Sequence, residues 1–567
     1  MRCERALIIF LHKIIQYLTN SMKKPELLLP AGTLDRLKTA ILYGADAVYC
    51  GTPDMSLRVK SGFTLEDVVE GIKFAHSHGK KVYLTLNLFS HNKDIEKLPQ
   101  FIETVKAVKP DGLIISDPGV FQFVKEHAPD LEIHISTQAN VCSWLTVDFW
   151  EKQGASLVVM AREVSFEELA VVREKCPNIK IETFVHGSMC MTYSGRCLLS
   201  NFMAERGANQ GSCAHSCRWG YKLKIKLKDN TEHEIEINET NKEMFDFFLE
   251  EEIRPGALMP FEEDVHGSYI LNSKDLCLLP KLDEYIKLGL DSFKVEGRNK
   301  TEFYAGSVAR VYRAAIDDYM ENPETWNAND YMDEINSVAN RGYTLAFHDG
   351  RLTDLAHDYE STGSTSFYEY AARVIGWDGD DLIIEGKNRL DAGDVLEFLS
   401  PHQREPILLR IYEFKKIKQT PEGKYFDHEI SDKLHAGQKP LFRIPASDFH
   451  LFKIEKLKQL LPPLSLIRKE KMNIESEKLK VESRQLSHQL EAGEVREEKY
   501  ETKRKKYFAA LEVADPNSPG QISPRTPRIG QEGCCGKGCN GCLIFWHDDK
   551  YSKAREILKT KKIGEML

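Results

Sequence analysis

Short apolar runs alternate with amphipathic stretches along the first half of the chain. The runs are rich in β-branched residues and predict strands at 26–30, 46–50, 81–87, 111–116, 131–136, 156–161, 179–185, 268–273 and 291–297. The stretches between them, such as 62–79, place apolar residues at helical spacing and end at glycine. This alternation implies a parallel sheet with right-handed crossovers. Eight or nine such units favour an α/β fold of the closed (β/α)8-type barrel over an open sheet.

The alternation changes in the rest of the chain, which predicts several further segments. Residues 22–330 are interpreted as the barrel domain, with an insertion at 219–265 that carries a hairpin over 222–237. A connector at 331–364 leads to a strand-rich region at 365–446, which predicts a small C-terminal β-barrel. Residues 450–510 are charged and helical, 511–532 form a Pro/Ser linker, and 533–567 hold a Cys-rich motif and a terminal helix.

The first 21 residues resemble a short signal peptide, because Arg2 and Arg5 precede an apolar run. His12 and Lys13 interrupt that run, and no small-residue cleavage site follows it. We therefore interpret 1–21 as a mis-assigned start or an extension before Met22, with a membrane anchor as the alternative. No later apolar segment reaches the roughly 20 residues that a membrane span requires, so no stable membrane association is expected.

Thirteen cysteines are many for a chain of 567 residues, and eight of them lie in two clusters. Clustered thiols favour metal binding in a reducing compartment over a disulfide framework, which predicts a cytoplasmic protein. The net charge of −9 is uneven, since residues 451–567 carry 24 Lys and Arg against 17 Asp and Glu. This basic end is compatible with binding a polyanion, and equally with a solvated helical face.

The first cluster consists of Cys190, Cys197, Cys213 and Cys217, in the spacing C-x6-C-x15-C-x3-C. Four thiolates that converge suit a tetrahedral zinc or an iron–sulfur cluster. The array begins directly after the predicted strand 179–185, and the C-terminal ends of barrel strands line the active face of such folds. The position therefore favours a catalytic metal centre, with a zinc that only holds the insertion in place as the alternative.

The second cluster consists of Cys534, Cys535, Cys539 and Cys542 among glycines. Its close spacing allows the chain to wrap tightly around a metal, so it is a possible second metal site. A redox-active or metal-scavenging tail is the alternative.

Several separated motifs occur in an order that resembles one known family. They are PELLLPAG (25–32), YGADAVYCG (43–51), SDPG (116–119), FVHGSMCMTYSGRCLLS (184–200), NSKDLCLL (272–279), FKVEGR (293–298) and NRGYT (340–344). Over residues 22–446 the chain resembles the collagenase-like (PrtC-type) peptidase U family, and most closely its tRNA hydroxylation branch.

The resemblance implies an RNA-modifying hydroxylase that works without molecular oxygen. It implies a [4Fe-4S] cluster on Cys190, Cys197, Cys213 and Cys217, prephenate as hydroxyl donor and 5-hydroxyuridine at the wobble position of tRNA as product. The iron–sulfur assembly machinery would be a partner. A collagenase-like peptidase and a related hydroxylase acting on ribosomal RNA remain the alternatives. Proteolysis has little support, since there is no G-x-S-x-G and His233-Glu234 lacks the second His of a zincin motif.

Candidate site residues follow from this resemblance and from the predicted strand ends. Prephenate carries two carboxylates, which guanidinium groups bind in a bidentate manner. The candidates for that role, each of which could instead form a structural ion pair, are Arg58, Arg162, Arg196 and Arg298. Asn87 and Gln138 are candidates for neutral hydrogen bonds to the substrate.

The candidate catalytic residues are His186, Lys294 and Glu296. His186 follows a predicted strand and could orient a substrate, or could be a satisfied loop histidine. Lys294 and Glu296 alternate on one strand, so both side chains are expected on one face of it, inside the barrel. They could form an acid/base relay or a core ion pair.

Overall fold

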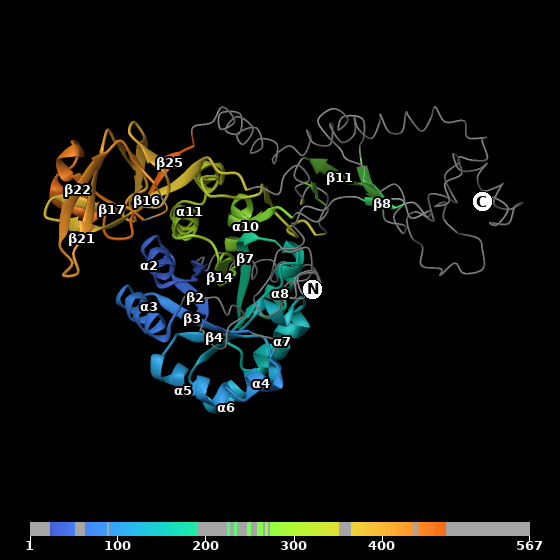
Figure 1. The fold of residues 1–567 in the computed structure, drawn as a ribbon. Helices are drawn as coiled ribbons and strands as arrows, with labels where there is room; N and C mark the ends of the chain where they lie inside the picture. Colours follow the sequence, from blue (N-terminus) through green and yellow to red (C-terminus); the bar gives the residue numbers. More distant parts are fainter. Residues whose placement is uncertain are drawn as a thin grey trace, which may run out of the picture. The chain divides into compact units, whose positions relative to one another are not determined.

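The structure is a computed structural model, and it describes residues 23–51, 63–87, 90–189, 273–350, 356, 364–435, 437 and 439–471, with the backbone of five short strands between 224 and 269. Eight parallel strands form a closed barrel, because β14 pairs with β7 on one side and with β1 on the other (Figure 1). The strands are β1 (Glu26–Pro30), β2 (Ala47–Gly51), β3 (Lys81–Leu86), β4 (Gly112–Ile115), β5 (Glu132–Ile135), β6 (Leu157–Val159), β7 (Lys180–Ser188) and β14 (Ser292–Val295). The predicted (β/α)8-type barrel is confirmed.

Helices surround the strands, and several begin at side chains that satisfy the free N–H groups of a first turn. Thr64 and Asp67 form a capping box at α3, Ser165 and Glu168 form one at α8, and Asp117 accepts from two N–H groups of α6. The barrel helices are α2 (Leu34–Leu42), α3 (Leu65–Ser77), α5 (Leu98–Val108), α6 (Pro118–His127), α7 (Trp144–Gln153), α8 (Phe166–Lys175), α10 (Leu282–Lys287) and α11 (Glu302–Glu321), with short α4 (Asn92–Ile95) after β3.

The predicted strand at 268–273 is wrong as a barrel element. Among the described residues of this stretch, Gly267–Tyr269 forms the strand β12, which pairs antiparallel with β11 (Leu258–Asp264) of the insertion. Next along the chain, β13 (Asp275–Cys277) pairs antiparallel with β7 and parallel with β15 (Tyr343–Thr344). Barrel closure needs only eight strands, and β14 supplies the last one.

Two apolar layers stabilise the barrel. Inside it, Leu28, Ala47, Tyr49, Tyr83 and Ile114 form one cluster. A larger cluster fills the space between strands and helices. Each buried Leu or Phe contributes about 1.5–3 kcal/mol, so this core holds the strand ends rigidly.

A second, curled antiparallel sheet follows the barrel, as predicted for 365–446, with its own core. Its strands are β16 (Tyr368–Asp378), β17 (Asp381–Gly386), β19 (Val395–Leu399), β20 (Ile407–Arg410), β21 (Phe414–Gln419), β22 (Tyr425–Ser431), β24 (Leu441–Pro445) and β25 (Leu466–Glu470), beside a small pair, β18 (Leu390–Asp391) and β23 (Lys433–Leu434). The helical interpretation of 450–510 holds for α13 (Ile454–Leu460) and is wrong for β25, which pairs with β16 and β19 in the sheet. Residues 472–510 lie outside the described residues.

Specific contacts join the second sheet to the barrel helices. Tyr43, which follows α2, donates its hydroxyl to the Leu399 carbonyl and accepts from the Leu466 N–H at 2.8 Å. Arg373 of β16 binds Asp35 of α2 at 2.5 Å. The connector contributes α12 (Asn329–Ile335), whose Glu334 binds Arg468 of β25 at 2.9 Å.

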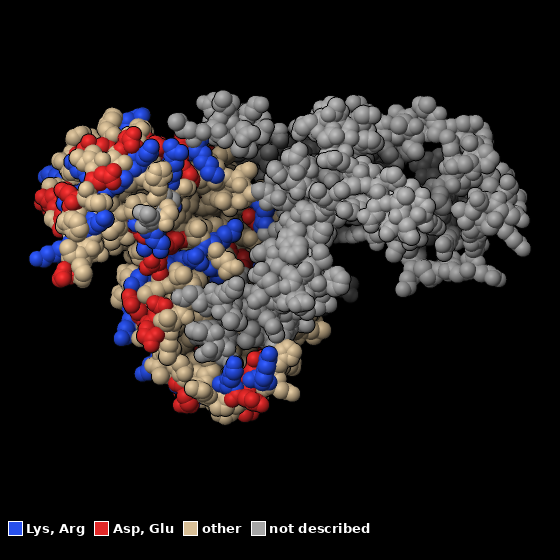
Figure 2. All heavy atoms as spheres, viewed as in Figure 1, with Lys and Arg blue, Asp and Glu red and all other residues tan. Residues whose placement is uncertain are grey.

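The insertion contains the predicted hairpin, β8 (Lys224–Lys226) with β9 (Glu232–Glu234), and a second group, β10 (Phe247–Glu250), β11 and β12. Lys and Arg are interspersed with Asp and Glu on the described face (Figure 2). Among the described residues, no helix combines the length and apolar character that crossing a membrane demands. The segments 1–21, 511–532 and 533–567 lie outside the described residues.

Candidate functional site

The C-terminal ends of β3 to β6 bring together four buried polar groups that lack protein partners. Within the described residues, no hydrogen-bond partner reaches Asn87 Oδ1, Ser116 Oγ, Gln138 Oε1 or Arg162 Nε. These residues follow β3, β4, β5 and β6 in order along one side of the barrel. A buried polar atom without a partner costs about 1–3 kcal/mol, so four at neighbouring strand ends indicate a site built for a ligand.

Ser136 fixes the two amide side chains of this group. Its hydroxyl oxygen accepts from Asn87 Nδ2 at 3.3 Å and from the Gln138 backbone N–H at 3.3 Å. With the Asn87 amino group engaged in this way, its carbonyl oxygen is left as an acceptor. The predicted substrate-binding residues Asn87 and Gln138 are therefore placed together, and the structure adds Ser116 and Ser136 to them.

The guanidinium of Arg162 stacks on the Phe184 ring, and its Nε has no hydrogen-bond partner among the described residues. Its guanidinium lies 4.0 Å from the centre of the Phe184 ring, and its side chain is 9% exposed. Arg162 Nη2 lies 3.5 Å from Glu296 Oε2, too long for a strong bidentate pair. A structural ion pair, the alternative expected for each of these arginines, is therefore present with Glu296 but weak, and Arg162 keeps donors for an anion.

Arg298 lies at the end of β14, within reach of β1, β2 and β3. Its Nη1 donates to Thr85 Oγ1 at 3.1 Å, and its carbonyl accepts from Arg36 Nη1 at 3.0 Å. A Cβ on Gly32 would lie 2.2 Å from that carbonyl oxygen, so only glycine fits the turn after β1. The structure thus brings Arg162 and Arg298 to the same end of the barrel.

Lys294 forms a buried ion pair inside the barrel, but not with the residue that alternates with it. Its Nζ lies 2.7 Å from Glu182 Oε1 of β7, with side-chain exposures of 6% and 1%. Ser292 donates to the other carboxylate oxygen at 2.7 Å, and Nζ lies 4.5 Å from the centre of the Tyr49 ring. Sequence reasoning missed Glu182 as a site residue. Its inward position on the alternating strand 179–185 was the available signal.

Glu296 faces a different set of groups. Its carboxylate lies 3.5 Å from both Arg162 Nη2 and the Tyr49 hydroxyl. Tyr49 also donates to the Val295 carbonyl at 3.0 Å. Tyr49 therefore stands between the Lys294–Glu182 pair and the Arg162–Glu296 pair, and no direct Lys294–Glu296 relay is formed among the described contacts.

His186 lies on the outer face of the barrel wall. A register shift between Lys294 and Val295 sets His186 opposite Val295, and its ring packs against Tyr304 and Tyr312 of α11. Burial lowers the pKa of His186 to about 3, so the ring is neutral. This placement contradicts a catalytic role at the mouth of the barrel. The alternative of a satisfied loop histidine is right in that the ring has a partner, the Tyr312 hydroxyl at 3.4 Å, but His186 lies within β7 and not in a loop.

The remaining predicted residues lie outside the described residues. They are Arg58, Arg196, Cys190, Cys197, Cys213, Cys217, Cys534, Cys535, Cys539 and Cys542. The structure does describe the residues that directly precede Cys190, the first residue of the first array: β7 ends at Ser188, and Met189 is buried. Gly187, within β7 at φ +118°, lies close to Glu296, because a Cβ there would be 2.6 Å from the Glu296 carbonyl oxygen.

Two described thiols near the barrel are poor nucleophiles. Burial raises the pKa of Cys50, at the end of β2, to about 12. Burial likewise raises the pKa of Cys277, in β13, to about 11. Both remain protonated at neutral pH, which disfavours cysteine-protease chemistry at either residue.

Comparisons with known proteins find similar sequences over most of this chain. The sequence profile described as "Peptidase family U32" matches residues 32–357. The chain is 39% identical to the tRNA hydroxylation protein P of Escherichia coli, over 70% of this chain and 91% of that protein. It is 38% identical to the protein of the same name from Haemophilus influenzae, over 67% and 86%. A protein named collagenase, from Porphyromonas gingivalis, is 27% identical over 73% and 96%.

Proposed function

The chain belongs to peptidase family U32, and from that premise we propose that it is a tRNA hydroxylase. In the finer form of the proposal it makes 5-hydroxyuridine at the wobble position without molecular oxygen, with prephenate as hydroxyl donor. The relatives named for tRNA hydroxylation are 39% and 38% identical to this chain, against 27% for the protein named collagenase, which supports this reading over that of a peptidase.

The observation that carries the proposal is the row of buried polar atoms at the ends of β3 to β6. Asn87 and Gln138 offer amide oxygens that accept hydrogen bonds, and Arg162 offers a guanidinium N–H. A uracil ring has an imide N–H between two carbonyl oxygens, and prephenate combines a hydroxyl with carboxylates. Both ligands match a mixed set of acceptors and donors, as base readout in a pocket requires.

The cluster implied by the family fits the chemistry of the donors in the sequence. Cys190, Cys197, Cys213 and Cys217 would hold a [4Fe-4S] cluster, since four thiolates are its usual ligand set. When bound, the cluster would supply one-electron chemistry next to the substrate.

The described side chains would do the rest. Arg162 and Arg298 would orient the anionic donor. The Lys294 ammonium, held by Glu182 and facing Tyr49, would stabilise negative charge or supply a proton at the barrel axis.

Mass spectrometry of tRNA nucleosides tests the function. A strain that lacks this gene, and any redundant enzyme, should lose 5-hydroxyuridine and nucleosides derived from it. The wild-type chain should restore them, and Arg162→Gln should restore less than a tenth. Gln122→Ala, on the exposed surface of α6, is the matched control and should restore them fully. Unchanged nucleosides in the deletion strain would refute the proposal.

The cofactor is tested separately from the activity. Protein purified without air should contain iron and acid-labile sulfide and absorb visible light. Cys190→Ala should remove most of the iron, whereas Cys142→Ala, at an exposed thiol, should not. Stoichiometric zinc without iron would support the structural-zinc alternative instead.

A further inference from the structure

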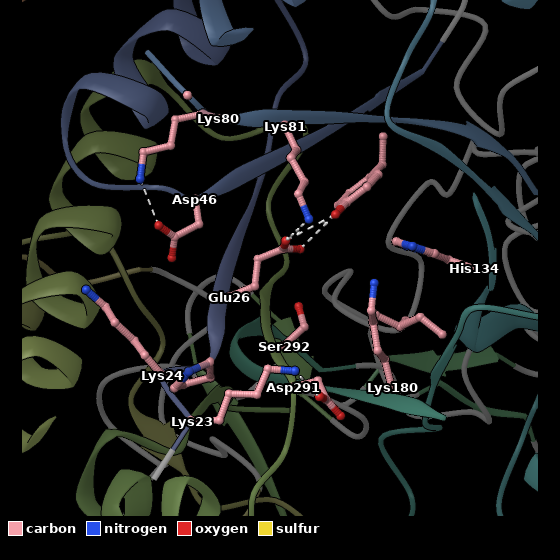
Figure 3. Close-up of a pocket in the computed structure, with 14 residues that line it drawn as sticks. Lys23, Lys24, Glu26, Asp46, Lys80, Lys81, His134, Lys180, Asp291 and Ser292 are labelled. Carbon is pink, nitrogen blue, oxygen red and sulfur yellow. Dashed lines mark hydrogen bonds and ion pairs between the residues drawn. The ribbon is translucent and has the colours of Figure 1, made fainter. Parts of the chain in front are cut away.

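A pocket of about 340 Å³ lies at the opposite end of the barrel from the candidate site. Its wall is made by residues at the beginnings of strands, among them Glu26 of β1, Lys81 of β3 and Lys180 of β7 (Figure 3). The volume is at the lower end of the range for pockets that bind small molecules.

The innermost wall of this pocket is polar where barrel interiors are usually filled by branched apolar side chains. Glu26, Tyr83, His134 and Ser292 line it, and His134 and Tyr83 are almost fully buried. The Tyr83 hydroxyl donates to the Glu26 carboxylate at 3.1 Å, and the two rings of Tyr83 and His134 lie 4.5 Å apart. Burying polar groups here lowers stability unless something satisfies them.

The wall carries an excess of positive charge. Five lysines (Lys23, Lys24, Lys80, Lys81 and Lys180) line the pocket against three carboxylates (Glu26, Asp46 and Asp291), an excess of two. Adding the ionic partners of these groups brings in Arg173, Arg313, Glu132 and Asp317 and leaves the excess unchanged.

Two of the three carboxylates each bind a lysine and an arginine at once: Asp291 lies 2.8 Å from Lys23 Nζ, and Asp46 lies 2.8 Å from Lys80 Nζ. Asp291 also binds Arg173 at 2.9 Å and the Ile181 N–H at 3.0 Å. Asp46 also binds Arg313 at 2.7 Å and the Leu27 N–H at 3.0 Å. These carboxylates therefore compensate the lysine charges only in part.

His134 adds a specific requirement. Its Nε2 lies 3.3 Å from Glu132 Oε2, and because an ionised carboxylate only accepts hydrogen bonds, Nε2 carries the ring proton. In the neutral ring with this tautomer Nδ1 is an acceptor, and it is buried without a hydrogen-bond partner in the described structure. A ligand that donates one hydrogen bond would satisfy it.

We propose that this pocket binds a small dianion that also carries a hydroxyl group. The two negative charges match the excess of lysines, and the hydroxyl donates to His134 Nδ1. Hydrogenphosphate and a hydroxydicarboxylate such as malate share this chemistry. The binding is independent of the reaction proposed for the other end of the barrel.

Two matched pairs of anions test the proposal by isothermal titration calorimetry at constant ionic strength. Hydrogenphosphate is compared with sulfate, and malate with succinate; within each pair the charge is the same and only the hydroxyl differs. We expect at least one hydroxyl-bearing dianion to bind saturably, about tenfold tighter than its partner, as one hydrogen bond to a buried group predicts. Which of the two binds more tightly identifies the class of the natural ligand.

Variants separate the two parts of the argument. Lys180→Gln, at a side chain that is 40% exposed, should weaken binding of every dianion at least fivefold. His134→Phe should abolish the preference for the hydroxyl, with its fold checked by circular dichroism. Lys106→Gln, at an exposed ion pair on α5, should change nothing. Absence of saturable binding by all four anions, equal affinity within both pairs, or wild-type affinity in Lys180→Gln would overturn the proposal.

Discussion

The buried pair between Lys294 and Glu182 makes a quantitative prediction about stability. In Glu182→Gln the ammonium loses its only described carboxylate partner, 2.7 Å away, while remaining almost fully buried. Removing one member of a buried ion pair typically costs about 3–5 kcal/mol. The ammonium could instead lose its proton, which for an ordinary lysine costs about 4–5 kcal/mol at pH 7 and therefore sets an upper limit. We expect a loss of about 3–5 kcal/mol.

The double variant Glu182→Gln/Lys294→Met distinguishes a lost charge partner from lost packing. Because it buries no charge, it should lie within about 1.5 kcal/mol of the wild type. The matched control is Asp283→Asn on α10, whose ion pair with Lys287 has the same 2.7 Å distance but is partly exposed. That change should cost no more than about 0.5 kcal/mol.

The measurement is thermal and urea denaturation followed by circular dichroism, on the whole chain. In a domain of this size each kcal/mol lowers Tm by about 2 °C, so Glu182→Gln should melt about 6–10 °C lower than the wild type. A decrease below about 2 °C, or a double variant as unstable as Glu182→Gln, would refute the reasoning that the pair compensates its own burial.

Three further predictions concern single side chains. Burial holds the folded-state pKa of His186 at about 3, below its ordinary 6.5, so between these pH values the unfolded chain binds one proton more than the folded chain. The stability that this residue contributes is therefore complete above pH 6.5 and is lost toward pH 3. In His186→Gln the free energy of unfolding, measured by urea denaturation, should depend less on pH over that range, by up to about 1.4 kcal/mol per pH unit. Arg162→Lys keeps the charge but loses the planar stack on Phe184, so tRNA hydroxylation should fall at least about tenfold while Tm changes little; wild-type turnover would exclude the stacked fork as the functional element. Cys50→Ala should keep at least half of the activity, because a thiol with a pKa of about 12 is not a nucleophile, and complete inactivation with an unchanged fold would contradict this.

The barrel could be predicted from the sequence because its signal is local. Each strand is a short β-branched run followed by a helix with a recognisable start, as at Thr64 and Ser165, so eight of the nine predicted runs became barrel strands. The error at 268–273 had a non-local cause. Whether a run joins the barrel depends on which neighbour pairs with it, and β7 pairs with β14 across the intervening insertion.

The candidate site was predictable in part for the same reason. Asn87, Gln138 and Arg162 follow strand ends, and strand ends converge in any such barrel. The partner of Lys294 was not predictable, because it depends on the register between β7 and β14. The bulge in that register also places His186 on the outer face, where simple alternation from Glu182 and Phe184 would have set it inside.

The pairing of β14 with both β1 and β7 has a consequence for how the chain is made. During synthesis β1 emerges first, yet its second neighbour is complete only at Val295, after the whole insertion has been translated. At roughly 5–20 residues per second, the β1 edge waits roughly 15 to 50 seconds for its partner. Over that time a half-built barrel exposes two strand edges, each a template for pairing with another chain. Nascent chains of this protein should therefore depend on chaperone binding until β14 is released from the ribosome, and shortening the insertion should reduce that dependence.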